Sequence, residues 1–484
     1  MLEKLQPIDV WKYFEEILQI PRPSKKEEKI IAYLENFAQH QKLNFKKDKA
    51  GNVLITKSAT RGYEKCQTVV LQSHVDMVCE KNSQSTHNFD KDPIVPIIDG
   101  AWVKAKETTL GADNGIGIAT QLAILASNNI NHGPLECLFT TDEETGLTGA
   151  NALKPNFFTG KTLINLDSED EGEIFIGCAG GRDTVITFKY EPKKAPGKQI
   201  PLQLSVSGLT GGHSGDDINK GYANAIKLLT RALYYLDNEY GIKLAQINGG
   251  NLRNAIPREA NAIFYVTHEK VKKIKNDVHH FEKTVQDEFK HTEPNMKIKI
   301  LETEKVPFII DKRTQPRLIQ SLYACPHGVM AMSQEIPGLV ETSTNLASVK
   351  ILNKNKIEVT TSQRSSVESA KTDILNMVEA TFLLAGARVV HSDGYPGWKP
   401  NTNSKILKIA VSTYQHLFHK EPKVKAIHAG LECGLFLEKY PSLDMISIGP
   451  TMKGVHSPAE RLHIESVELF WKFLLEILKN IPTE

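Results

Sequence analysis

Five segments of the sequence concentrate side chains that can bind metal ions. Their centres are His74, Asp113, the acidic run 142–144, Asp167 and His456. Imidazole nitrogens and carboxylate oxygens in this mixture suit Zn²⁺ best, with Mn²⁺ and Co²⁺ as alternatives. The set would supply two dications with one terminal histidine and one terminal carboxylate each, and with one carboxylate to share. We therefore expect a site for two divalent metal ions.

Each segment taken alone also has an ordinary structural explanation. His74 could be a lone histidine at a strand end, with Asp76 placed to accept the second ring N–H. The segment 110–117 could be an Asn-Gly turn before a helix, or its glycines could let the backbone approach an ion. The acids 142–144 could lie in a solvated loop, although a dication would turn their repulsion into binding. His456 could equally stand at the start of a helix.

The surrounding pattern predicts where these segments lie. Apolar runs predict strands at 52–56, 68–72, 135–140 and 162–166, and the segment 116–127 is typical of a helix. Strands that alternate with helices favour an α/β domain with a mainly parallel central sheet. Ligand sites in such sheets lie beyond the carboxyl ends of the strands, which is where most of the metal-type residues stand.

The N-terminal region predicts two helices. Apolar side chains between Val10 and Leu18 follow the i, i+3, i+4 spacing, and two prolines at 21 and 23 would end that helix. Ser24 and Glu27 have the spacing of a capping box, so we expect both to bond to the backbone at the start of the second helix.

The character of the sequence changes after about residue 185. Pro, Gly and Lys in 192–197 are typical of a linker. The region that follows predicts an α+β insertion, and its repeated strand and helix pattern leaves open that it consists of two similar halves. We expect a discontinuous catalytic domain, 1–186 plus 397–484, interrupted by a lid domain, 187–396.

Composition excludes several classes of protein. The chain has 484 residues, a hydrophobic fraction of 40% and a net charge of +2, without the basic stripe of a nucleic-acid-binding protein. Its apolar runs are shorter than the ~20 residues of a membrane span, and its first ten residues lack a signal-peptide core. Six cysteines without a CxxC pair favour reduced thiols in a cytoplasmic protein. We therefore expect no nucleic-acid or membrane partner.

The order of the motifs resembles that of the co-catalytic metallopeptidases, the family that includes aminoacylase, tripeptidase T and carnosinase. The resemblance covers essentially the whole chain, including the inserted lid. The motifs LQSHVDMVCEKN, LGADNGIGIA, HSGDDINKG and HAGLECG are similar to those of the bacterial aminoacyl-histidine dipeptidases. The resemblance implies metal-dependent hydrolysis of small dipeptides of the type Xaa-His, such as β-alanyl-histidine.

The resemblance also implies a role for each metal-type residue. His74, Asp113 and Asp167 would hold one ion, and Asp113, Glu144 and His456 would hold the other. Glu143 would be the general base for a water that bridges the metals, and Asp76 would orient His74. The Asp113–Asn114 peptide would be cis, as in relatives.

A dipeptidase must also recognise both ends of its substrate. Arg364 is our candidate for the C-terminal carboxylate, because guanidinium binds carboxylate in a bidentate manner, and Asn254 could assist. Glu432 is our candidate for the N-terminal ammonium. Arg364 and Glu432 could instead form an ordinary surface salt bridge. By resemblance, His213 would donate to the oxyanion, and the enzyme would be a homodimer whose partner subunit could supply that histidine.

Two other functions compete with the dipeptidase prediction. An N-acyl-amino-acid deacylase on the same scaffold would use the same metals and base, but would not need Glu432, because its substrates lack a free ammonium. A catalytically inactive relative could act as a binding protein. The presence of all five ligands and Glu143 argues against that second alternative.

Overall fold

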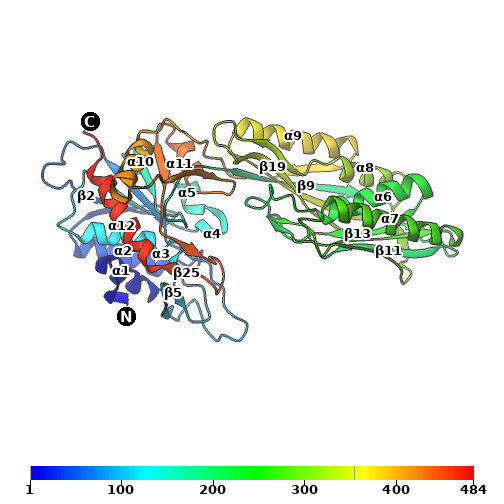
Figure 1. Cartoon of the computed structure of the whole chain (residues 1–484), viewed down its shortest axis with the longest axis horizontal. Helices are drawn as coiled ribbons and strands as arrows, with labels where there is room; N and C mark the ends of the chain where they lie inside the picture. The colour runs from blue at the N-terminus through cyan, green and yellow to red at the C-terminus, as the bar shows by residue number, and fades with distance from the viewer. Residues whose placement is uncertain (1, 354, 484) are drawn as a thin grey trace. The chain divides into compact units, whose positions relative to one another are not determined.

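The computed structural model describes residues 2–353 and 355–483 and divides into two units. Unit 1 comprises Met1–Gly177, Trp398–Ala426 and Leu431–Glu484, and unit 2 comprises Cys178–Gly397 and Ile427–Gly430. In Figure 1 the helices of unit 1 carry blue, cyan, orange and red, and those of unit 2 carry green and yellow. Residue 186 lies inside strand β9 (Gly180–Lys189), which pairs with β20 (Lys356–Ser365) and therefore belongs to the sheet of unit 2.

An eight-stranded sheet forms the centre of unit 1, in the order β1-β2-β6-β3-β7-β23-β8-β22. The strands span, in that order, Asn44–Lys47, Val53–Lys57, Leu135–Thr140, Val69–His74, Thr162–Asn165, Asp444–Ser447, Glu173–Cys178 and Lys423–Ile427. Strands β6, β3, β7 and β23 are parallel, whereas β1, β2 and β8 join the sheet antiparallel. The predicted α/β class is confirmed, and its parallel part is the centre of the sheet.

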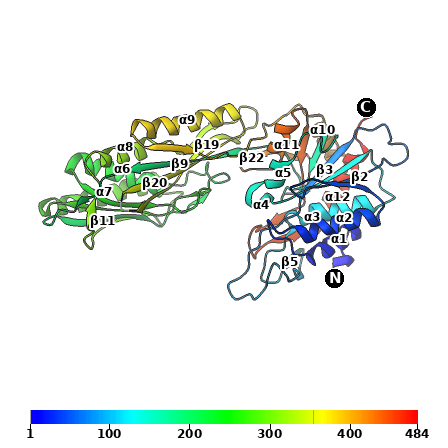
Figure 2. The ribbon, with the colours of Figure 1, turned by 180° about the vertical axis from the view of Figure 1, so that it is seen from behind.

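Helices cover this sheet with their apolar faces. The main ones are α1 (Ile8–Leu18), α2 (Glu28–His40), α3 (Ala112–Ala126), α10 (Lys405–Phe418), α11 (Cys433–Lys439) and α12 (Ile464–Lys479). Helix α1 packs on α3, which contacts β3, and α10 packs on α12. Figure 2 shows α1, α2 and α3 side by side beneath the strands. Within the described ranges, no helix is both long enough and apolar enough to cross a lipid bilayer.

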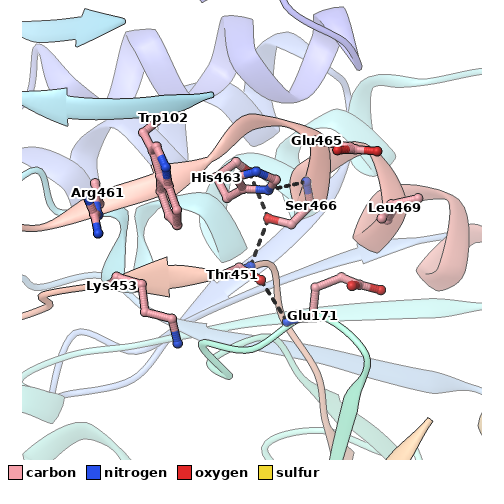
Figure 3. Close-up of a pocket in the computed structure, with 9 residues that line it drawn as sticks. All are labelled: Trp102, Glu171, Thr451, Lys453, Arg461, His463, Glu465, Ser466 and Leu469. Atoms are coloured by element: carbon pink, nitrogen blue, oxygen red, sulfur yellow. Dashed lines mark hydrogen bonds between the residues drawn. The ribbon is translucent and has the colours of Figure 1, made fainter. Parts of the chain in front are cut away.

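A smaller four-stranded sheet, in the order β24-β25-β5-β4, also belongs to unit 1. Its strands span Met452–Lys453, Arg461–His463, Trp102–Ala105 and Pro96–Asp99. Beside it lies an open cavity of about 620 Å³, shown in Figure 3. Cations lining it already have partners, because Lys453 bonds to Asp170 at 2.7 Å and Arg461 lies over the ring of Trp102. None of the residues predicted to bind metal or substrate lines this cavity.

Unit 2 is built on a nine-stranded sheet, in the order β16-β11-β15-β13-β19-β20-β9-β21, with β18 paired to β19. Besides β9 and β20, its strands are β11 (Ile200–Ser207), β13 (Lys243–Gly249), β15 (Ala260–Val266), β16 (Lys297–Glu302), β18 (Gly328–Met332), β19 (Val340–Asn353) and β21 (Arg388–His391). The helices that pack on it are α6 (Ala225–Tyr240), α7 (Val271–Glu288), α8 (Thr314–Ala324) and α9 (Glu368–Leu384). Among the described residues, the strands of this sheet pair antiparallel.

The sheet of unit 2 contains the same strand and helix order twice. One set is β11, α6, β13, β15, α7 and β16, and the other is β9, α8, β19, β20, α9 and β21. In each set the last strand lies beside the first, β16 beside β11 and β21 beside β9. The two sets meet in the middle of the sheet, where β13 pairs with β19. One hydrophobic core runs under both sets.

The predicted capping box at the second helix is wrong. Helix α2 begins at Glu28, and the side chain of its N-cap residue, Glu27, makes no capping hydrogen bond. The Ser24 hydroxyl instead donates to Asp76 Oδ2 at 2.7 Å, and Glu27 Oε1 accepts from the N–H groups of Lys25 and Asp142 at 2.8 and 3.1 Å. Ser24 is therefore bonded to a residue distant in the sequence, and Glu27 is shared between a neighbouring and a distant N–H group.

Candidate metal centre

The parallel strands bring three of the five segments to one edge of the sheet. His74, the last residue of β3, pairs with Thr140, the last residue of β6, and Gln72 pairs with Asn165 at the end of β7. The residues that follow β6 and β7 therefore emerge next to His74. These residues include Glu143, Glu144 and Asp167.

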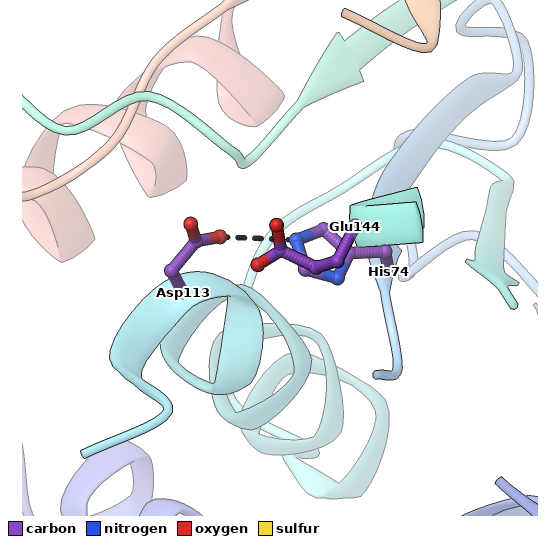
Figure 4. Close-up of side chains that lie close together, drawn as sticks. All are labelled: His74, Asp113 and Glu144. Atoms are coloured by element: carbon purple, nitrogen blue, oxygen red, sulfur yellow. Dashed lines mark hydrogen bonds and ion pairs between the residues drawn. The ribbon is translucent and has the colours of Figure 1, made fainter. Parts of the chain in front are cut away.

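The donor atoms of the five predicted ligands form two groups that share Asp113. In the first group, His74 Nε2 lies 3.0 Å from Asp113 Oδ1 and 3.3 Å from Asp167 Oδ1. In the second, His456 Nε2 lies 3.2 Å from Asp113 Oδ2 and 3.0 Å from Glu144 Oε2. Figure 4 shows His74, Asp113 and Glu144 directed toward one another. One donor atom from each of these three residues lies within 4.8 Å of the others. The two oxygens of Asp113 thus face different histidines.

Electrostatics at this cluster favour positive charge. Hydrogen bonds to Asp113 and Glu144 raise the pKa of His456 to about 11. Burial opposes the charge on His74, but the carboxylates of Asp167 and Asp113 raise its pKa above the usual range. Burial, together with the neighbouring carboxylates, raises the pKa of Asp167 to about 6. A dication would relieve the same repulsion among the carboxylates.

The donor set fits divalent metal ions. Each group offers one imidazole nitrogen and two carboxylate oxygens, which are ligands that Zn²⁺ and similar ions accept. Four of the five side chains are largely buried, and Glu144 Oε1 has no hydrogen-bond partner among the described residues. His456 is the exception, with a side chain that is 51% exposed. Its ring reaches the cluster from a loop, so the alternative of a helix-start residue is wrong.

Glu143 interacts electrostatically with His74 and Asp167, but the ion pairs that define the two groups among the described residues do not include it. Burial raises the pKa of its carboxyl group well above the usual range, and the carboxylates of Asp167 and Glu432 raise it further. Its neighbour Glu144 has a side chain that is only 5% exposed, and Asp142 is 4% exposed. The alternative of a solvated acidic loop is therefore wrong.

Asp76 connects the first histidine to the segment of Glu143. Its Oδ1 lies 3.3 Å from His74 Nδ1 and accepts from the Glu143 N–H at 3.0 Å, while its Oδ2 accepts from the Glu144 N–H at 3.2 Å. Burial opposes its ionisation, but bonds with His74, the Glu143 N–H and the Ser24 hydroxyl lower its pKa to about 2. The anionic Asp76 thus lies on the Nδ1 side of the His74 ring, while Nε2 faces Asp113.

The glycines of 110–117 leave space that other protein atoms occupy, and their role in letting the backbone approach an ion stays a prediction. A Cβ on Gly117 would meet Asn114 Oδ1 at 2.0 Å, and a Cβ on Gly111 or Gly115 would meet the Arg22 guanidinium at 2.7 Å. The Asp113–Asn114 peptide is cis, as expected. Asn114 also donates to Asp167, so it orients a predicted ligand.

Glu432 lies buried among polar side chains of the central strands. It is 0% exposed, and its Oε2 accepts from Gln72 Nε2 at 2.6 Å and from the Thr140 hydroxyl at 2.7 Å. Burial raises its pKa to about 8, and the carboxylate of Asp167 adds to the rise. The alternative of a surface salt bridge with Arg364 is wrong, because Arg364 is itself only 8% exposed and donates to the Tyr395 hydroxyl at 3.1 Å.

The other three predicted substrate-binding residues lie in unit 2. His213 pairs with Ala255 in a short two-stranded sheet, and the Ser214 N–H donates to the carbonyl of Asn254 at 2.8 Å. The carboxylate of Asp216, 3.3 Å from His213 Nδ1, has its pKa lowered by that histidine and by Arg364. His213, Asn254 and Arg364 therefore lie in one region of unit 2.

Several residues bond to the segments of the cluster although the sequence did not predict that role for them. Arg22, Ser24, Asn114 and Glu460 bond to the segments that carry the predicted ligands. For two of them the sequence position could have indicated the role, because Asn114 stands next to Asp113 and Glu460 lies in the segment of His456. Arg22, between two prolines, had no such indication.

Comparison with known proteins gives consistent matches. The chain is 44% identical over 483 residues to the cytosol non-specific dipeptidase of Escherichia coli (strain K12), covering 100% of this chain and 99% of that one. It superposes with a TM-score of 0.93 and 43% identity on a crystal structure of an aminoacylhistidine dipeptidase from Vibrio alginolyticus, covering 100% and 99%. A Staphylococcus aureus tripeptidase, 16% identical with a TM-score of 0.56 and 99% coverage of both chains, shares the fold.

A family model provides the final comparison. The model for peptidase family M20/M25/M40 matches residues 70–480, which include all five predicted metal ligands. This match and the full-length identity to the dipeptidase lead to one conclusion. The chain belongs to peptidase family M20/M25/M40.

Proposed function

We propose that this protein is a metal-dependent dipeptidase that hydrolyses Xaa-His dipeptides such as β-alanyl-histidine. The observation that carries the proposal is the position of Asp113, whose two carboxylate oxygens face His74 and His456 at 3.0 and 3.2 Å. A carboxylate that faces two ligand groups could hold two dications close together, as two-metal catalysis requires. The name of the similar Escherichia coli enzyme, a non-specific dipeptidase, supports dipeptides as substrates, and the name of the Vibrio alginolyticus enzyme supports histidine as their second residue.

The five ligands would hold two Zn²⁺ ions, with Mn²⁺ or Co²⁺ as substitutes. His74 and Asp167 would complete one site, and Glu144 and His456 would complete the other, with Asp113 common to both. When bound, such ions acidify water and polarise a peptide carbonyl. Asp76 would keep the His74 ring in the tautomer that leaves Nε2 free for binding.

Glu143 would act as the general base and then as the acid. Its raised pKa suits a group that must take a proton from water and return it to the leaving amine near neutral pH. Because its carboxyl group stands outside both donor groups, it is available for proton transfer. The Asp76 carboxylate would fix its backbone through the bond to the Glu143 N–H.

Four residues would select dipeptides by their two charged ends. Arg364, assisted by Asn254, would bind the C-terminal carboxylate, and His213 would donate to the oxyanion. Glu432 would bind the N-terminal ammonium, because a cation beside this buried carboxyl group would lower its raised pKa. We extend the proposal to a cytoplasmic homodimer, supported by the name of the Escherichia coli relative and by the family resemblance.

The substrate class predicts a clear preference between two related compounds. We expect the protein to cleave β-alanyl-histidine and to leave its N-acetylated form largely intact, because acetylation removes the ammonium that Glu432 would bind. Amine release from both compounds, followed under identical conditions, measures the preference. Cleavage of the acetylated compound alone would identify an N-acyl-amino-acid deacylase instead.

Metal dependence predicts a reversible loss of activity. Dialysis against EDTA should remove the ions and abolish hydrolysis of β-alanyl-histidine, and Zn²⁺, Mn²⁺ or Co²⁺ should restore it, because Glu143 alone cannot activate water sufficiently. The assay compares activity and metal content before and after each step. Full activity in metal-free protein would exclude the proposed chemistry.

A further inference from the structure

A buried carboxylate outside the ligand set binds the backbone that carries Asp113. Glu460 is 2% exposed, and its Oε2 accepts from the N–H groups of Leu110 and Gly111 at 2.7 and 3.0 Å. Its Oε1 accepts from the N–H groups of Ala112 and Asp113 at 2.8 and 3.3 Å. One side chain thus engages four consecutive backbone donors that end at the shared ligand.

A buried guanidinium holds the same loop through its carbonyl groups. Arg22 is 1% exposed and donates through Nη1 to the carbonyls of Val75 and Asp76 at 3.1 and 2.7 Å, and through Nη2 to the carbonyl of Gly111. Its planar donors fix the relative position of these segments. The space it occupies depends on glycine, because a Cβ on Gly111 or Gly115 would approach Nη2 to 2.7 Å.

The two side chains connect the Asp113 loop to the segments of both histidines. Glu460 lies on the same loop as His456, and Arg22 holds the two residues that follow His74. Asp113 must present one oxygen to each histidine, so a small shift of its loop would weaken one donor group or the other. Holding the loop from both sides would keep both contacts.

A simpler structural role explains this arrangement less well. A serine, threonine or aspartate within the loop itself could satisfy N–H groups at the start of a helix. Here a carboxylate from a segment nearly 350 positions away along the chain is buried for this purpose. Burial of an ionised group costs free energy unless the group is fully bonded. We therefore infer that Glu460 serves to position the Asp113 loop accurately, and not only to stabilise the fold.

We propose that Glu460 and Arg22 are positioning residues, which hold Asp113 so that it can bind both metal ions at once. This inference rests on the proposed di-metal function. It predicts that loss of either side chain weakens metal binding by about tenfold to a hundredfold, as for other groups that orient metal ligands. The fold of the metal-free protein should change much less.

The experiment compares Glu460→Gln, Glu460→Asp and Arg22→Lys with the unaltered protein and with Glu468→Gln. The control residue lies on α12, has a side chain that is 40% exposed and pairs with Lys472. Zn²⁺ affinity is measured by competition with a chromophoric chelator, and the visible absorption of the Co²⁺-loaded protein reports ligand geometry. The melting temperature of each metal-free variant separates folding from metal binding.

We expect Glu460→Gln and Arg22→Lys to lose affinity and to alter the Co²⁺ spectrum, and Glu460→Asp to lose less, because it keeps the charge. Glu468→Gln should match the unaltered protein. Unchanged affinity and spectrum in folded Glu460→Gln would overturn the inference, as would unchanged values in Glu460→Asp and Arg22→Lys if the glutamine variant does not fold. If the unaltered protein itself bound no Zn²⁺, the proposed function would fail instead.

Discussion

Glu143→Gln should reduce kcat for β-alanyl-histidine by about a hundredfold to ten-thousandfold, the usual contribution of a general base. The amide has the shape of the carboxyl group but cannot accept the proton of the attacking water. Because the Glu143 carboxyl group lies outside both donor groups, metal content should equal that of the unaltered protein. Steady-state kinetics and metal analysis of the purified variant measure both quantities.

Glu144→Gln is the matched control, since it makes the same chemical change one residue along the chain. Glu144 Oε2 lies 3.0 Å from His456 Nε2, so this variant should lose one ion together with its activity. If Glu143→Gln lost metal and Glu144→Gln retained it, the two glutamates would have exchanged roles.

Asp113→Ala should release both metal ions and lower activity to that of the metal-stripped protein. Each donor group would keep only one histidine and one carboxylate, because both groups use an oxygen of this residue. Catalytic zinc sites have three protein ligands, and two are too few to retain the ion. Metal content after dialysis, with activity at saturating and limiting Zn²⁺, measures the effect.

Asp170→Ala provides the control for Asp113→Ala. Asp170 has a side chain that is 42% exposed and pairs with Lys453, so its loss should leave metal content and activity unchanged. Retention of one tightly bound ion in Asp113→Ala would show that the carboxylate serves a single metal.

Patterns within one element were predicted well from the sequence. Alternation of strands and helices predicted the α/β class, and the apolar runs that end near His74 and Thr140 correspond to β3 and β6. Because parallel strands share one carboxyl edge, His74, Glu144 and Asp167 could be expected near one another. These expectations needed only periodicity and the geometry of a sheet.

Side chains whose partners are distant in the sequence were predicted less well. Ser24 and Glu27 have capping-box spacing, yet Asp76 takes the serine hydroxyl and Asp142 contributes an N–H to the glutamate. Local spacing could not reveal this, because the competing partners reach the helix start only after folding. Gly111 and Gly115 are a second example, because the guanidinium of Arg22, which is distant in the sequence, occupies the space that a Cβ at either position would need.

The sequence by itself determined which donors are present, which strand ends carry them and which family the motifs resemble. Tertiary structure alone decided that the two oxygens of Asp113 face different histidines, and that Glu460 and Arg22 hold its loop. The physical reason is that a donor's type and local backbone are fixed by nearby residues. Its direction depends on hydrogen bonds from segments that only the folded chain brings together.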